Sequence, residues 1–146
     1  MKLFDLVRVV CFSLLIPFNS DAQSSRGYEK WTSEVRNKGS GKHDLVFHVK
    51  IEKGWHLFYY KSGEGMSELP GITFKKNEDV VLDGELERYS VKGSTSGKGE
   101  VDEYEYIQKI KVKRKTNVRA EVAYQLNQRD MCTAPIRVNF EFDVVE

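Results

Sequence analysis

Cys132 is the residue whose type most directly suggests chemistry, and it lies near the end of the stretch Val122–Pro135 (VAYQLNQRDMCTAP). A cysteine thiolate attacks the sulfur atoms of disulfides, so such a residue can take part in thiol–disulfide exchange. The alternative is a small buried side chain, because free cysteines are among the residues most often buried. The polar segment 127–130 before Cys132 and Pro135 after it favour an accessible position.

Metal binding is the second chemistry to consider. The side chains that a soft metal accepts are His48, His56, Met66, Met131 and Cys132. Their spacing matches no recognised set of ligands, so we predict no metal site and no cofactor. The chain also lacks an evident Ser-His-Asp set, paired carboxylates or a phosphate-binding loop.

The N-terminal segment has the pattern of a secretory signal. An apolar run, Val9–Phe18, follows two basic residues and precedes Ser20 and Ala22, which are small residues at the −3 and −1 positions of a cleavage site. We therefore predict that residues 1–22 are a signal peptide cleaved after Ala22 and that residues 23–146 form the mature protein in the periplasm or outside the cell. The alternative is an N-terminal anchor or an ordinary first strand.

Cleavage would remove Cys11 and leave Cys132 as the single cysteine, so the mature chain would hold no internal disulfide. The 146 residues include 23 basic and 22 acidic side chains, a balance that argues against a nucleic-acid or membrane-surface partner chosen by bulk charge. No apolar run reaches the 18 residues that would indicate a transmembrane segment. We expect one domain with a sizeable core.

Apolar and polar residues alternate along most of the mature chain, and no segment keeps a helical period. About eight strands are expected, at 31–35, 45–51, 55–60, 72–74, 80–89, 104–114, 118–126 and 136–144. The segments 37–42, 61–69 and 91–99 are predicted to be loops. Short, evenly spaced strands predict an all-β fold, specifically a single-domain, immunoglobulin-like antiparallel β-sandwich.

Alternation also predicts which side chains share the core. One face of three strands supplies Leu45, Phe47, Val49, Ile51, Ile110, Val112, Phe140 and Phe142. Trp55 and Leu57 are expected to join them, although the aromatic strand 55–60 could instead floor a peptide or glycan groove. The basic residues of segment 109–115 are expected to form a solvated face on an edge strand.

Three features together resemble the periplasmic N-terminal domain of the DsbD-type thiol:disulfide interchange protein. They are the turn and strand Lys53–Phe58 (KGWHLF), the run Val122–Gln125 before the loop, and Cys132 followed by Pro135. The resemblance covers most of the mature chain, from about Trp31 to Val144, in the order and spacing of its expected strands.

The resemblance implies an immunoglobulin-like sandwich that relays electrons. In the family, a cysteine pair between the last two strands takes electrons from a membrane partner and passes them to periplasmic thioredoxin-like proteins. The second cysteine of the pair falls on Cys132, but the first falls on Asn127, which cannot form a disulfide. The family's cap loop falls on Val91–Gly99, which contains no aromatic residue.

Two functions therefore remain open, and with them the question of whether the protein is an enzyme. The first is thiol:disulfide interchange through Cys132 with thioredoxin-like or other periplasmic proteins, by mixed disulfide or surface contacts. The second is a non-catalytic, immunoglobulin-like protein-binding module that has lost the redox chemistry. Asn127 in place of the partner cysteine is the feature that favours the second.

Overall fold

The computed structural model describes residues 29–61, 63–91, 95–96 and 99–146, and this part of the chain forms strands and turns without a helix. It therefore contains no helix that is long and apolar enough to cross a membrane. The predicted signal peptide, residues 1–22, lies outside the described residues.

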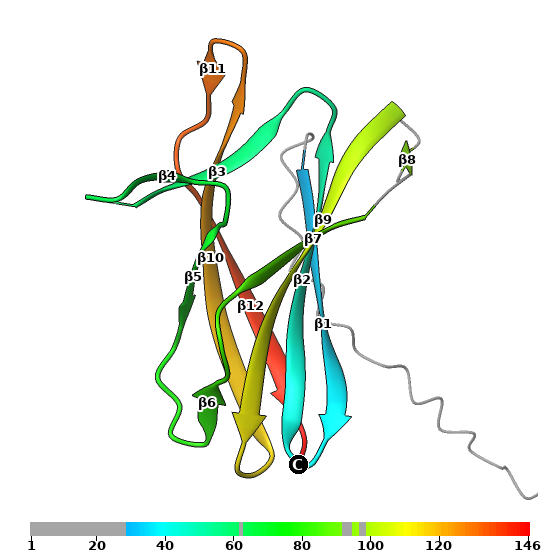
Figure 1. Cartoon of the computed structure of the whole chain (residues 1–146), viewed down its shortest axis with the longest axis vertical. Helices are drawn as coiled ribbons and strands as arrows, with labels where there is room; N and C mark the ends of the chain where they lie inside the picture. Colours follow the sequence, from blue (N-terminus) through cyan, green and yellow to red (C-terminus); the bar gives the residue numbers. More distant parts are fainter. Residues whose placement is uncertain (1–28, 62, 92–94, 97–98) are drawn as a thin grey trace, which may run out of the picture.

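In the described residues, twelve strands form two antiparallel sheets (Figure 1). The first sheet contains β1 (Glu29–Gly39), β2 (Lys42–Glu52), β9 (Gly99–Val112), β6 (Val80–Leu82), β7 (Glu87–Val91) and β8 (Thr95–Ser96). The second contains β10 (Thr116–Gln128), β12 (Ile136–Val144), β5 (Gly71–Phe74), β3 (His56–Lys61), β4 (Gly65–Ser67) and β11 (Met131–Cys132). The predicted all-β fold and its antiparallel sandwich of two sheets are confirmed.

One core fills the space between the sheets. The alternation of apolar and polar residues explains how the strands supply this core, and β12 shows it most clearly. Its residues alternate strictly between buried and exposed, as the pleat of a strand with one covered face requires. Phe140 meets Phe47 of the opposite sheet edge-on, with ring centroids 5.2 Å apart. All eight predicted core residues belong to this cluster. Leu57 is also buried there, and Trp55 packs against it while half-buried.

Several predicted bounds were wrong. Segment 37–42, expected to be a loop, falls largely within β1 and β2, and segment 91–99 contains β8. Glycines account for two further errors. The expected strand 80–89 is divided into β6 and β7 around Gly84, whose φ of 86° takes the backbone out of the extended region. The expected loop 61–69 instead contains β4, which pairs with β3 through Tyr60 opposite Met66. Gly63 and Gly65 adopt positive φ at the tip of this hairpin.

The basic residues of segment 109–115 do not lie on an edge strand. β9 pairs with β2 along one side and with β6 and β7 along the other, so it is an inner strand. Lys109 and Lys111 are exposed as expected, but Lys109 forms an ion pair with Glu87 of β7, and Lys111 forms one with Asp83, which directly follows β6. These lysines form part of a solvated face of mixed charge.

Candidate functional site: the Cys132 hairpin and the adjoining cavity

Cys132 lies on a short hairpin at one end of the sandwich. β10 continues past its last pair with β12, Tyr124 opposite Ile136, and turns back into β11 (Figure 1). Arg129 and Asp130 form the two-residue tip, where Arg129 has a φ of 49°. The segment before β12 includes Pro135, which cannot donate a ladder hydrogen bond. The hairpin therefore projects from the end of the second sheet, away from the C-terminus.

Asn127 and Cys132 face each other directly across this hairpin. The backbone N–H of Thr133 donates to the carbonyl of Leu126 at 2.8 Å, so Leu126 and Thr133, the neighbouring pair on the ladder, are a hydrogen-bonded pair. Because such positions alternate along an antiparallel ladder, Asn127 and Cys132 form a non-hydrogen-bonded pair, with Cα atoms about 4.5 Å apart. A disulfide requires a Cα separation of about 4.4–6.8 Å. Two cysteines at these positions could therefore be bridged.

The thiol of Cys132 is exposed, and it is the one cysteine within the described residues. Gln125 lies on the same face of β10 as Asn127, two residues earlier. Its Nε2 donates to the carbonyl of Thr133 at 3.1 Å and lies 4.0 Å from Sγ of Cys132. The sulfur is thus presented at the surface beside an amide that the backbone holds in place.

A cavity of about 360 Å³ lies beside Asn127, between the ends of the two sheets. It is lined by Trp55, His56, Leu57, Phe58, Met66, Glu68, Arg88, Tyr104, Tyr106 and Asn127. The Arg88 Nη1 atom lies 2.9 Å from Oε2 of Glu68, and the guanidinium carbon lies 5.5 Å from the ring centroid of Tyr104. Oδ1 of Asn127 is buried and has no hydrogen-bond partner in the described part of the chain.

The two tyrosines of the cavity are neutral at physiological pH. Burial raises the pKa of Tyr106 well above its usual range, although nearby Arg88 acts in the opposite direction. Burial likewise raises the pKa of Tyr104, and the carboxylate of Asp102 adds to the effect. Their hydroxyls can therefore take part in hydrogen bonds but do not serve as bases.

The five residues considered as metal ligands are only partly brought together: His56 and Met66 line the same cavity, and Met131 is adjacent to Cys132 on β11. His48 lies in the first sheet, where its Nε2 is 3.5 Å from Oε1 of Glu34 and its Nδ1 is 3.9 Å from Oε2 of Glu105. His56 pairs with Asn127 on β10, one strand further from Cys132. Over the residues that the structure describes, no group of three His, Cys, Asp or Glu side chains could hold a metal ion.

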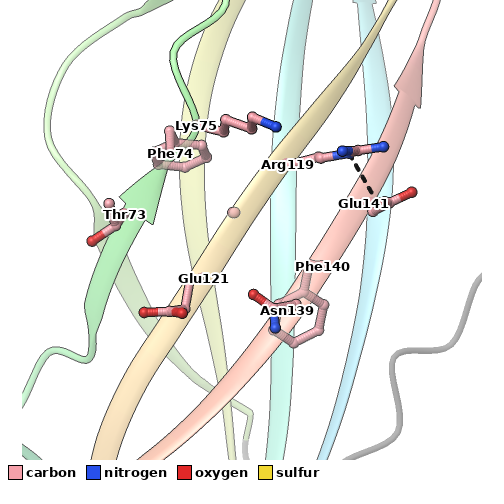
Figure 2. A pocket seen from close by; sticks show the side chains of 9 residues that line it. Thr73, Phe74, Lys75, Arg119, Glu121, Asn139, Phe140 and Glu141 are labelled. Atoms are coloured by element: carbon pink, nitrogen blue, oxygen red, sulfur yellow. Dashed lines mark ion pairs between the residues drawn. The ribbon is translucent and has the colours of Figure 1, made fainter.

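A second cavity, of about 340 Å³, lies on the second sheet where β5, β10 and β12 run together (Figure 2). Its polar side chains include Lys75, Glu121 and Asn139, and Arg119 forms an ion pair with Glu141 at 3.0 Å. The cavity holds neither a thiol nor a histidine. We therefore place the candidate site at the hairpin rather than here.

The sequence identified Cys132 and Asn127, and it offered the aromatic strand 55–60 as the floor of a groove; Trp55, Leu57 and Phe58 of this strand line the cavity. It did not indicate Gln125, Arg88 or Glu68 as part of the site. Gln125 precedes Asn127 by two residues in an alternating strand, so its position on the same face could have been read from the pattern. Arg88 and Glu68 gave no signal, because only the pairing of distant strands brings them to the cavity.

No family model matches the chain, and no curated protein matches it. Among solved structures, the chain is similar to the N-terminal periplasmic domain of ScsB from Proteus mirabilis, with a TM-score of 0.46 and 13% sequence identity. The alignment covers 78% of this chain and 46% of that chain. The chain thus spans less than half the length of the solved chain that it matches.

Proposed function

We propose that this protein is an exported domain that exchanges disulfides with thioredoxin-like partners through Cys132. The observation that carries the proposal is the exposed thiol of Cys132 on a projecting hairpin, directly opposite Asn127. The motifs around Lys53–Phe58 and Cys132, which resemble the DsbD-type N-terminal domain, support the same chemistry.

The proposed reaction is a single exchange. The Cys132 thiol gives its proton to solvent, and the thiolate attacks one sulfur of a disulfide in the partner. A bond forms between the two sulfurs as the partner's disulfide bond breaks, and the partner's other sulfur leaves as a thiolate. Asn127 carries no thiol that could release the mixed disulfide, so release requires the partner's own thiolate or another external thiol. Each molecule of the domain would therefore form one mixed disulfide at a time, through Cys132.

This proposal predicts a specific combination of activities in the purified chain. Cys132 should react with a thiol reagent in the folded state and form a mixed disulfide with a small disulfide. Without an added thiol, each chain should complete no more than one exchange, and a Cys132→Ser control should complete none. Multiple turnovers without added thiol would contradict the one-thiol reaction, and labelling that occurs only after denaturation would contradict the whole proposal.

Export is the second part of the proposal. It is supported by the apolar run Val9–Phe18 and by the small residues Ser20 and Ala22. Intact mass of the exported protein should show a chain that begins at Gln23. A mass that includes residues 1–22 would contradict cleavage at this site.

A second candidate, a non-catalytic protein-binding module, is favoured by one observation. The residue facing Cys132 is Asn127, and it lines a cavity with aromatic walls that could receive a partner without any bond to sulfur. If this is the function, a Cys132→Ser variant should bind the partner with unchanged affinity. A loss of stable association in that variant would favour exchange.

A further inference from the structure

Building on the proposed exchange at Cys132, we infer that the adjoining cavity selects partners by a bulky apolar side chain close to their reactive cysteine. The cavity would hold that side chain while the two sulfurs react. The partner segment recognised would be an extended peptide in which an aromatic or large aliphatic residue lies one or two positions from the cysteine.

The distances along the hairpin set this spacing. Asn127 lines the cavity and directly faces Cys132, so the cavity begins one strand away from the sulfur. Neighbouring strands are about 4.8 Å apart, and an extended chain advances about 3.3–3.6 Å per residue. A residue one or two positions from a cysteine bound to Sγ can therefore reach the cavity mouth.

The walls of the cavity determine the kind of side chain. Trp55, Phe58 and Tyr104 are half-buried, Leu57 is 9% exposed, and Met66 is 66% exposed. A volume of about 360 Å³ is within the range of small-ligand sites and ample for one aromatic side chain. A flexible methionine beside aromatic rings suits apolar guests of varied shape.

The polar groups of the cavity further restrict which side chain of the partner it accepts. Oδ1 of Asn127 is a buried acceptor without a partner in the described chain, so a peptide N–H entering beside it would supply the missing hydrogen bond. Arg88 contributes a positive charge, and the nearby carboxylate of Glu68 is already paired with it. A basic guest would meet that positive charge without gaining a free carboxylate. For the partner residue next to the cysteine, the expected order of preference is therefore phenylalanine or leucine, then glycine, then lysine.

Short peptides test this order directly. Each contains a single cysteine carried as a mixed disulfide with thionitrobenzoate, and the preceding residue is phenylalanine, leucine, glycine or lysine. The rate of thionitrobenzoate release by the folded protein measures attack by Cys132. Partial burial of one apolar side chain should make the phenylalanine peptide react about tenfold faster than the glycine peptide.

Matched variants test whether the cavity walls cause the preference for the phenylalanine peptide. Replacing two of the walls, in a Phe58→Ser/Met66→Ser double variant, should reduce the difference between the phenylalanine and glycine peptides to roughly twofold or less. Val81→Ser changes a residue that is 52% exposed on β6, outside the cavity lining, and should keep the full preference. The unaltered and Val81→Ser proteins should consume a small disulfide without a peptide at the same rate. For the double variant, the rate with each peptide is divided by its own rate with the small disulfide, so that the comparison reports the preference and not the availability of Cys132.

A second readout works without any reaction at Cys132. In a Cys132→Ser protein, the phenylalanine peptide with serine in place of its cysteine should shift the indole N–H resonance of Trp55 and leave that of buried Trp31 unchanged. Equal rates for all peptides, with ready consumption of the small disulfide, would overturn the inference alone. If Cys132 attacks no disulfide at all, the proposed exchange fails, and the Trp55 resonance then decides whether the cavity binds the peptide.

Discussion

Replacing Asn127 with cysteine should close the hairpin with an internal disulfide. The two positions form a directly facing, non-hydrogen-bonded pair, so their side chains lie on the same face at a spacing that a disulfide accepts. The substitution is best made together with Cys11→Ser, so that the thiol count reports only the new pair. Mild oxidation should remove both free thiols without forming a dimer.

The size of the effect follows from the length of the ring. The bridge would close the six residues from Asn127 to Cys132. In the chain-entropy description, a ring of this size stabilises the folded state by about 2 kcal/mol, because the unfolded chain loses freedom. For a domain of this size, that corresponds to a rise of roughly 1 M in the urea midpoint. The same protein with and without reductant supplies the comparison.

Gln128→Cys is the matched control. Residue 128 is the next position along β10, so its side chain points to the opposite face from Cys132. This variant should keep both thiols under the same mild oxidation or form intermolecular disulfides. If the folded Asn127→Cys protein keeps both of its thiols, or if Gln128→Cys closes equally well, the deduced register of the hairpin is wrong.

Three further predictions concern stability. Phe140→Ala should cost about 3–5 kcal/mol in urea unfolding, because Phe140 is 1% exposed, and an unchanged midpoint would contradict the assigned core. His43→Leu should be neutral or stabilising, because both ring nitrogens are buried without a partner in the described chain; a loss above about 1 kcal/mol would indicate a bound water or another partner. Burial acts to raise the pKa of Glu34, but Arg36 and His48 lower it more, so the net shift is downward from 4.5. Because the folded pKa is depressed, this stabilisation is present above pH 4.5 and is lost as the pH falls through the folded value. Glu34→Gln should remove that acid-side loss, by less than about 1 kcal/mol because the side chain is exposed; an unchanged pH profile would refute the pairing.

The strands that were predicted well are those with one fully covered face. β12 was predicted with its observed bounds, Ile136–Val144, and the faces of β2 were assigned correctly from Leu45 to Ile51. A one-residue slip would expose every apolar side chain of such a strand, so the pattern itself specifies the register.

The geometry of the hairpin was harder to predict, because its turn lacks the residues that usually indicate a tight turn. The sequence predicted a polar tip at 127–130, whereas the structure has a two-residue tip with Arg129 at positive φ, a position usually held by glycine or asparagine. The facing of Asn127 and Cys132 depends on that tip length. The cavity depends on the pairing of β3, β4, β7, β9 and β10, which no local pattern specifies.

Formation of one defined mixed disulfide tests the central claim most directly. A thioredoxin-like protein with only its reactive cysteine, carried as a mixed disulfide with thionitrobenzoate, is added to the folded chain. The predicted result is release of one thionitrobenzoate per chain and a covalent heterodimer linked through Cys132, with neither product in the Cys132→Ser variant. Absence of the heterodimer while the two folded proteins still associate would contradict exchange and identify a binding module.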